Sequence, residues 1–261
     1  MSLPVLHQKK RESAPISMLA VYEAGFARLA HRAGVDAFLV GDSLGMVVQG
    51  NRDTLGVTVD DIAYHAQQVR RGAPDAFVIA DVPFLADADV PTALQTARVL
   101  MQQGQADMIK IEGGAEKATL IEALVQVGIP VCGHIGLLPQ LVRRDGGYRV
   151  HGREQQEYEQ VINNAKAVEK AGAAVVVIEC VPAALGRAVS HALQVPVIGI
   201  GAGCDVDGQV LVMHDLLGMT EKPPRFARDF LVGQSSIENA FRAYVQAVKE
   251  RSFPADDEMF S

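Results

Sequence analysis

The chain of 261 residues contains no tryptophan and only three cysteines, and aromatic residues make up 5% of it. The cysteines Cys132, Cys180 and Cys204 are odd in number and lack the close spacing of metal ligands, so neither a disulfide framework nor a zinc cluster is expected. Cys132 and Cys180 lie inside apolar runs. We therefore predict that both are buried as small hydrophobic side chains.

The sequence also lacks a long hydrophobic run and an excess of basic charge. No apolar run approaches the roughly 18 residues that a membrane-spanning helix requires. The basic N-terminal segment is not followed by an apolar stretch of the signal-peptide type. The formal net charge of -7 argues against a nucleic-acid-binding surface. We therefore expect a cytoplasmic protein that binds neither nucleic acid nor a membrane.

Short apolar runs alternate with helical stripes along the whole chain. In the stretch 37–45, four apolar residues fit a strand that is buried on both faces, and Gly41 and Asp42 end it abruptly. Strands are expected at 16–21, 37–40, 77–80, 108–111, 130–133, 174–178, 196–200 and 210–213. Continuous apolar strands that alternate with helices are typical of a parallel sheet covered by helices.

Glycines that end predicted helices recur at a regular spacing. Gly34, Gly104 and Gly172 each precede a strand, and the two intervals of 70 and 68 residues each hold two strand-helix units. Eight such units fill the chain and predict one (β/α)8 TIM barrel domain over residues 1–261, with a short N-terminal helix and a C-terminal helix. An open, doubly wound sheet is the alternative.

Polar residues stand at the ends of the second to sixth predicted strands. Because the carboxyl ends of parallel strands meet at one face, we expect these residues to converge in a single mouth. Like charges so close repel, so a metal ion or shared protons would be needed there. Oxygen ligands favour Mg2+ or Mn2+ over Zn2+. The residues are Asp42, Ser43, Asp81, Lys110, Glu112, His134 and Glu179.

Each of these residues also has a purely structural interpretation. Asp42 and Asp81 suit the capping of a turn or helix. Lys110 and Glu112, two apart on a strand, point the same way and suit an ion pair. A lone His134 suits a hydrogen-bonded core position. The coincidence of all of them at equivalent positions favours the functional interpretation.

Two loops leave alternatives open. Gly201-Ala202-Gly203 follows the seventh predicted strand and suits either a phosphate or another closely bound ligand, or a tight turn. The segment 138–153 contains four arginines. It is equally compatible with a solvated surface loop and with a mobile lid or anion contact.

Nine segments together resemble the ketopantoate hydroxymethyltransferase family. They run in order between about residues 16 and 230: VGDSLGMVVQG, TVDDIAYHAQQVRRGAP, ADVPF, IKIEGG, PVCGHIGLLPQ, GGYRVHGR, VIECVP, PVIGIGAG and DGQVLVMHD. The resemblance implies a barrel of the phosphoenolpyruvate/pyruvate superfamily, usually a homodecamer. It also implies that Mg2+ and the co-substrate 5,10-methylenetetrahydrofolate serve hydroxymethyl transfer to 3-methyl-2-oxobutanoate, the first committed step of pantothenate synthesis.

The resemblance also implies roles for individual residues. Asp42 and Asp81 match the family's Mg2+ ligands, and Glu112 matches a further, partly water-mediated metal contact. Ser43 and Lys110 match positions that contact the substrate, which also lies against Asp42 and Asp81.

Two further residues match the family pattern, and several other positions depart from it. Glu179 matches the proton acceptor, and His134 matches a histidine near the substrate. The sequence departs from the usual pattern at residues 22–25, which read Tyr-Glu-Ala-Gly where Tyr-Asp-Ala-Ser is usual. It also has Gly56 where proline is common and Leu138 where threonine is usual. None of these departures touches a matched metal-binding or base residue.

Two other functions fit the same barrel. One is a Mg2+-dependent lyase or mutase that acts on a 2-oxo acid without a one-carbon donor. The other is a non-catalytic protein that binds a 2-oxo acid or serves in assembly. Retention of the matched residues Asp42, Asp81, Lys110 and Glu179 argues against the second.

Overall fold

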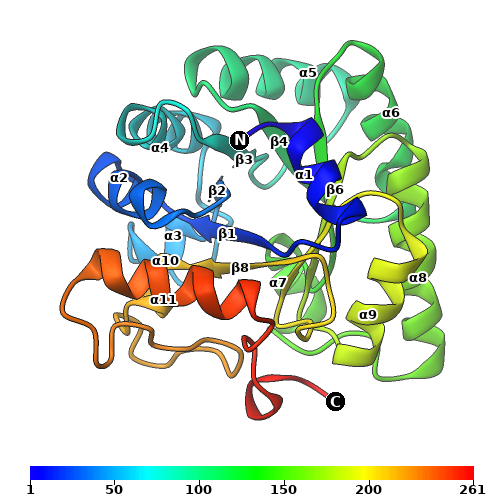
Figure 1. Cartoon of the computed structure of the whole chain (residues 1–261). Helices are drawn as coiled ribbons and strands as arrows, with labels where there is room; N and C mark the ends of the chain where they lie inside the picture. Colours follow the sequence, from blue (N-terminus) through cyan, green and yellow to red (C-terminus); the bar gives the residue numbers. More distant parts are fainter.

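Eight parallel strands close into a barrel in the computed structural model, which describes all residues 1–261 (Figure 1). Each strand pairs with the next along the chain, and the last pairs with the first. The closed barrel confirms the predicted (β/α)8 fold, and the open-sheet alternative is wrong. The strands are Ile16–Ala20 (β1), Ala37–Val40 (β2), Phe77–Asp81 (β3), Met108–Glu112 (β4), Val131–Gly136 (β5), Val175–Glu179 (β6), Val197–Ile200 (β7) and Gly208–Val212 (β8).

Helices surround the barrel and connect its strands (Figure 1). None of them combines the length and apolar character needed to cross a membrane. The longer ones are Ala24–Ala33 (α2), Val59–Gly72 (α4), Val90–Arg98 (α5), Ala118–Gln126 (α6), Gln155–Lys170 (α8), Ala183–Ala192 (α9) and Ile237–Lys249 (α11). The short ones are Leu44–Val47 (α3), Val142–Asp145 (α7) and Met213–Leu216 (α10).

The N-terminal helix α1 (Leu3–Arg11) lies over the amino ends of the strands. Lys9 pairs with Asp36, which precedes β2, and Lys10 pairs with Asp207, which precedes β8. The opposite end of the barrel, where the strands finish, is therefore the end left for a site.

Local sequence signals explain where several helices begin and end. Thr58 and Asp61 form a capping box at the start of α4, in which the side chain of each residue accepts a hydrogen bond from the backbone N–H of the other. Gly34 ends α2 in the left-handed conformation that favours glycine.

Cys132 and Cys180 are buried, as predicted.

Some boundaries differ from the prediction. Strand β5 continues to Gly136, so His134 lies within the strand instead of directly after it. Pairing explains the extension, because β5 is matched to Glu112 of β4 on one side and to Glu179 of β6 on the other. Helix α5 ends at Arg98 and continues directly into a π-helical turn over Val99–Gln103.

The backbone conformation and close packing of the turn after β7 explain why it contains Gly201 and Gly203. Gly201 and Gly203 both have positive φ angles, of 62° and 82°. A Cβ atom at either position would lie 2.6 Å from a neighbour, the ring of Phe226 or the side chain of Ala183. The tight-turn alternative is therefore sufficient to explain this motif.

Candidate active site

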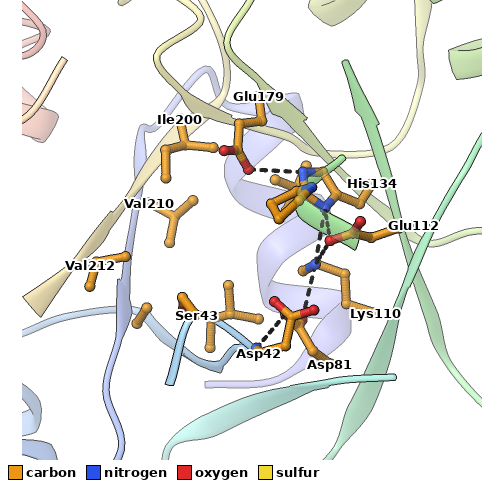
Figure 2. A pocket seen from close by; sticks show the side chains of 14 residues that line it. Asp42, Ser43, Asp81, Lys110, Glu112, His134, Glu179, Ile200, Val210 and Val212 are labelled. Carbon is orange, nitrogen blue, oxygen red and sulfur yellow. Dashed lines mark hydrogen bonds and ion pairs between the residues drawn. The ribbon is translucent and has the colours of Figure 1, made fainter. Parts of the chain in front are cut away.

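Seven residues singled out from the sequence line one cavity at the carboxyl ends of the strands (Figure 2). The cavity has a volume of about 90 Å³. The predicted convergence is thus observed, while the chemical roles of the residues stay predictions. The seven are Asp42, Ser43, Asp81, Lys110, Glu112, His134 and Glu179.

Strand register explains why these side chains meet. Lys110 and Glu112 alternate with apolar residues on β4, so both point into the barrel. Asp81 pairs with Lys110, and Glu112 pairs with His134 of β5. Neighbouring strands therefore present their charged residues at nearly the same height.

The Lys110 ammonium lies at the centre of the charged side of the cavity. Its Nζ is 3.1 Å from Asp81 Oδ1, 3.9 Å from Glu112 Oε1 and 3.0 Å from His134 Nδ1. Its side chain is only 3% exposed. The closest acidic partner is thus Asp81, so the structural alternative of a simple Lys110–Glu112 pair does not describe the site.

Burial changes the pKa values of the acidic residues in the cavity. Loss of hydration raises the pKa of Asp42, Asp81 and Glu112 above their usual values. Repulsion from neighbouring carboxylates raises the pKa of Asp42 further. Although burial opposes its charge, these carboxylates raise the pKa of Lys110. The site therefore combines one strongly held cation with more acidic groups than that cation neutralises.

His134 connects Lys110 to Glu179. An ammonium group only donates, so Nδ1 of His134 accepts from Lys110 and the imidazole proton resides on Nε2. Nε2 faces Glu179 Oε2 at 3.1 Å. Burial, aided by the charge of Lys110, lowers the pKa of His134, so the ring is neutral at neutral pH.

Gln140 completes the charged side, although the sequence did not single it out. Its backbone N–H donates to Glu112 Oε2, and its side-chain amide donates to Asp42 Oδ2 and to the carbonyl oxygen of Val82. Gln140 comes from the arginine-rich segment 138–153, whose course no periodic pattern reveals. Its role was therefore not predictable from strand-end positions.

The arginines of the same segment lie elsewhere. Arg143 pairs with Asp53, and Arg149 pairs with Glu157. Both guanidinium groups are more than half exposed, and no arginine lines the 90 Å³ cavity. The anion-contact alternative thus finds no support within this cavity.

Tyr22 was also missed as a site residue. Its hydroxyl lies 2.8 Å from Ser43 Oγ, behind the cavity wall. The residue follows β1 just as the other polar residues follow their strands. Its position was therefore an available signal, but its side chain is mostly apolar and lacks the charge that marks most of the other strand-end residues.

The acidic residues fit a divalent cation in their chemistry. Asp81 Oδ1 and Glu112 Oε1 are buried and face the Lys110 ammonium, but neither receives a well-aligned hydrogen bond. The backbone N–H of Asp42 donates to Asp81 Oδ2, so the two carboxyl groups are adjacent. No three His, Cys, Asp or Glu side chains are arranged to hold a metal ion. Two carboxylates nevertheless fit Mg2+, which usually keeps waters and binds substrate oxygens.

The opposite wall of the cavity is apolar. Figure 2 shows Ile200, Val210 and Val212 across from the charged cluster, with Glu179 between the two sides. A small cavity with one charged and one aliphatic wall suits a small ligand that has a polar end and an apolar end.

Comparison with known proteins gives a consistent result. A sequence model of the family described as ketopantoate hydroxymethyltransferase matches residues 1–256. The chain is 53% identical over 251 residues to the 3-methyl-2-oxobutanoate hydroxymethyltransferase of Halorhodospira halophila. The alignment covers 96% of this chain and 91% of the relative. It is 50% identical over 260 residues to the enzyme of the same name from Chromohalobacter salexigens, with 99% and 98% covered.

Solved structures share the fold at low sequence identity. Phosphoenolpyruvate phosphomutase from Streptomyces platensis subsp. rosaceus superposes with a TM-score of 0.63 and 16% identity, over 84% of this chain and 83% of that one. A 2,3-dimethylmalate lyase superposes with a TM-score of 0.59 and 18% identity, over 80% and 78%. At such identities the likeness supports the barrel fold alone.

The central position of Lys110 predicts a pH-dependent loss of stability in Lys110→Met. Carboxyl groups with a raised folded pKa favour the folded state at low pH, and this contribution is lost as the pH rises through the folded pKa. Without the ammonium group, the unpaired carboxylates should cost about 3–5 kcal/mol near neutral pH. Urea unfolding should therefore show a larger loss at about pH 8 than at about pH 5.

Lys117→Met is the matched control for this measurement. Lys117 pairs with Asp87 at 2.6 Å, but its side chain is 25% exposed. We expect a loss within about 1 kcal/mol at either pH. An equal, pH-independent loss in both variants would contradict the central role of Lys110.

Proposed function

The chain belongs to the ketopantoate hydroxymethyltransferase family, and on that premise we propose that it transfers a one-carbon unit from 5,10-methylenetetrahydrofolate to 3-methyl-2-oxobutanoate. The chain is a transferase, and its relatives support a role in forming ketopantoate. The observation that carries the proposal is the convergence of acidic residues, Lys110 and Glu179 in one small cavity. The family also implies Mg2+ and self-association, and we propose a cytoplasmic homodecamer.

The two walls of the cavity suit this substrate. The carboxylate and keto oxygens of 3-methyl-2-oxobutanoate would lie toward Lys110 and Ser43, and its isopropyl group toward Val210 and Val212. The reacting carbon C3, which is the methine carbon of this isopropyl group and is bonded to the keto carbon, would then lie near Glu179. Burial of the apolar branch and pairing of the charged end together favour this orientation.

Asp42 and Asp81 would hold Mg2+, with Glu112 in a more remote contact. The metal, when bound, would draw electron density from the substrate oxygens and make the C3 proton more acidic. Gln140 donates to both Asp42 and Glu112 and so restricts their side chains. The protein thereby sets the position of the acidic groups before any ligand enters.

Glu179 is the proposed base. Its carboxylate accepts the C3 proton, and the neutral His134, whose Nε2–H faces Glu179 Oε2, restricts its orientation. Lys110 keeps its positive charge near the substrate oxygens, where negative charge develops when the proton leaves. The methylene carbon is bonded to two folate nitrogens, and one of these carbon–nitrogen bonds breaks as C3 forms its new carbon–carbon bond to the methylene carbon. Water then adds the hydroxyl group to that carbon as the second carbon–nitrogen bond breaks. The two freed nitrogens take up two protons, equal in number to the one released from C3 and the one released from water.

The principal rival is a Mg2+-dependent lyase or mutase. It is separated by incubating the protein and 3-methyl-2-oxobutanoate with and without methylenetetrahydrofolate and Mg2+. We expect ketopantoate only when both are present. A product formed from the oxo acid without the folate would favour the rival, and absence of turnover under all conditions would favour a binding protein.

The role of Glu179 predicts a specific defect in Glu179→Gln. The variant should bind the oxo acid but lose exchange of its C3 proton with deuterated water by at least about a hundredfold, because the amide is not a base. Nuclear magnetic resonance can follow this exchange without the folate. Glu122→Gln on the exposed face of α6 should exchange normally. Undiminished exchange in Glu179→Gln would exclude Glu179 as the base.

A further inference from the structure

Tyr22 lies directly behind the substrate cavity and makes one polar side-chain contact there. The residue is 1% exposed and follows strand β1, which contributes no charged residue to the site. Its hydroxyl lies 2.8 Å from Ser43 Oγ and has no other hydrogen-bond partner. Ser43 in turn lines the cavity, and its hydroxyl has no other partner than Tyr22.

The direction of this hydrogen bond follows from what each hydroxyl can reach. The proton of the Tyr22 hydroxyl has no acceptor except Ser43 Oγ, and an unpaired buried donor is costly. Tyr22 is therefore the donor and Ser43 the acceptor. This leaves the proton of Ser43 for an oxygen atom that enters the cavity.

The surroundings keep Tyr22 in this position. His65 donates from Nδ1 to the backbone carbonyl oxygen of Tyr22 at 2.6 Å. The ring of His214 lies beside the phenol ring, with centroids 5.7 Å apart. Burial also raises the pKa of Tyr22, with a further contribution from nearby carboxylates, so the phenol stays protonated as a donor.

We propose that Tyr22 is a positioning residue that turns the Ser43 hydroxyl toward an oxygen atom of the bound 2-oxo acid. The inference rests on the proposed function, since it takes the ligand of the cavity to be that acid. The hydrogen bond from Tyr22 to Ser43 and the one from Ser43 to an anionic ligand oxygen would strengthen each other, because a hydroxyl group that accepts a hydrogen bond becomes a better donor. β1 thus contributes to the site indirectly, through Tyr22.

The test is Tyr22→Phe, which removes the hydroxyl and keeps the ring. We expect the dissociation constant and the KM for 3-methyl-2-oxobutanoate to rise roughly three- to tenfold, with a much smaller change in kcat. Binding of the acid is measured by calorimetry with Mg2+ and without the folate. In a Ser43→Ala background, Tyr22→Phe should produce no further loss of affinity.

Tyr244→Phe is the matched control. Tyr244 is also fully buried, and its hydroxyl contacts the backbone carbonyl oxygens of Met18 and Gln209, away from the cavity lining. This variant should lower the unfolding midpoint and leave KM unchanged. The stability of the Ser43 variants gives a second readout, because Ser43→Ala leaves the Tyr22 hydroxyl without an acceptor. The double variant should therefore unfold at a higher midpoint than Ser43→Ala alone.

Three results would overturn the inference. The first is an unchanged KM in Tyr22→Phe, and the second is an equal loss of affinity in the presence and absence of Ser43. The third is a double variant no more stable than Ser43→Ala. If the unaltered enzyme neither binds nor converts the oxo acid, the proposed function itself fails, and this inference fails with it.

Discussion

A buried ammonium group among carboxylates is the interaction on which the site depends. Lys110 lies within 4 Å of Asp81 and Glu112, and all three side chains are almost completely buried. One cation does not neutralise the acidic groups around it, and burial raises the pKa of three of them. Such a site gains from any ligand that brings further positive charge, and this imbalance supports the proposal that it binds Mg2+.

The barrel makes this imbalance possible. Its strands end at a common face, and the register of β3, β4 and β5 places Asp81, Lys110 and His134 side by side. The core beneath them is apolar, so the charged groups have few partners except one another. Gln140 and Tyr22 add hydrogen bonds from loops, which restrict Asp42 and Ser43 without adding charge.

Much of the site could be predicted because parallel strands end together. Asp42, Asp81 and Glu179 each follow an apolar run, so their convergence was visible in the sequence. The extension of β5 past His134 was not visible, because glycines interrupt its apolar pattern and pairing with neighbouring strands decides its length. The role of Gln140 was not predictable for a different reason. It contacts Asp42 and Glu112 from the short 3-10 helix Pro139–Leu141, whose position depends on tertiary packing.

We propose that Asp42 and Asp81 bind a divalent cation together with a 2-oxo acid. This binding is tested most directly by a crystal structure with Mn2+ and 3-methyl-2-oxobutanoate, in which anomalous scattering locates the metal. We expect one anomalous peak within coordination distance of carboxylate oxygens of Asp42 and Asp81, with two substrate oxygens as further ligands. A substrate bound in the cavity without the ion, or an ion bound away from both aspartates, would contradict it.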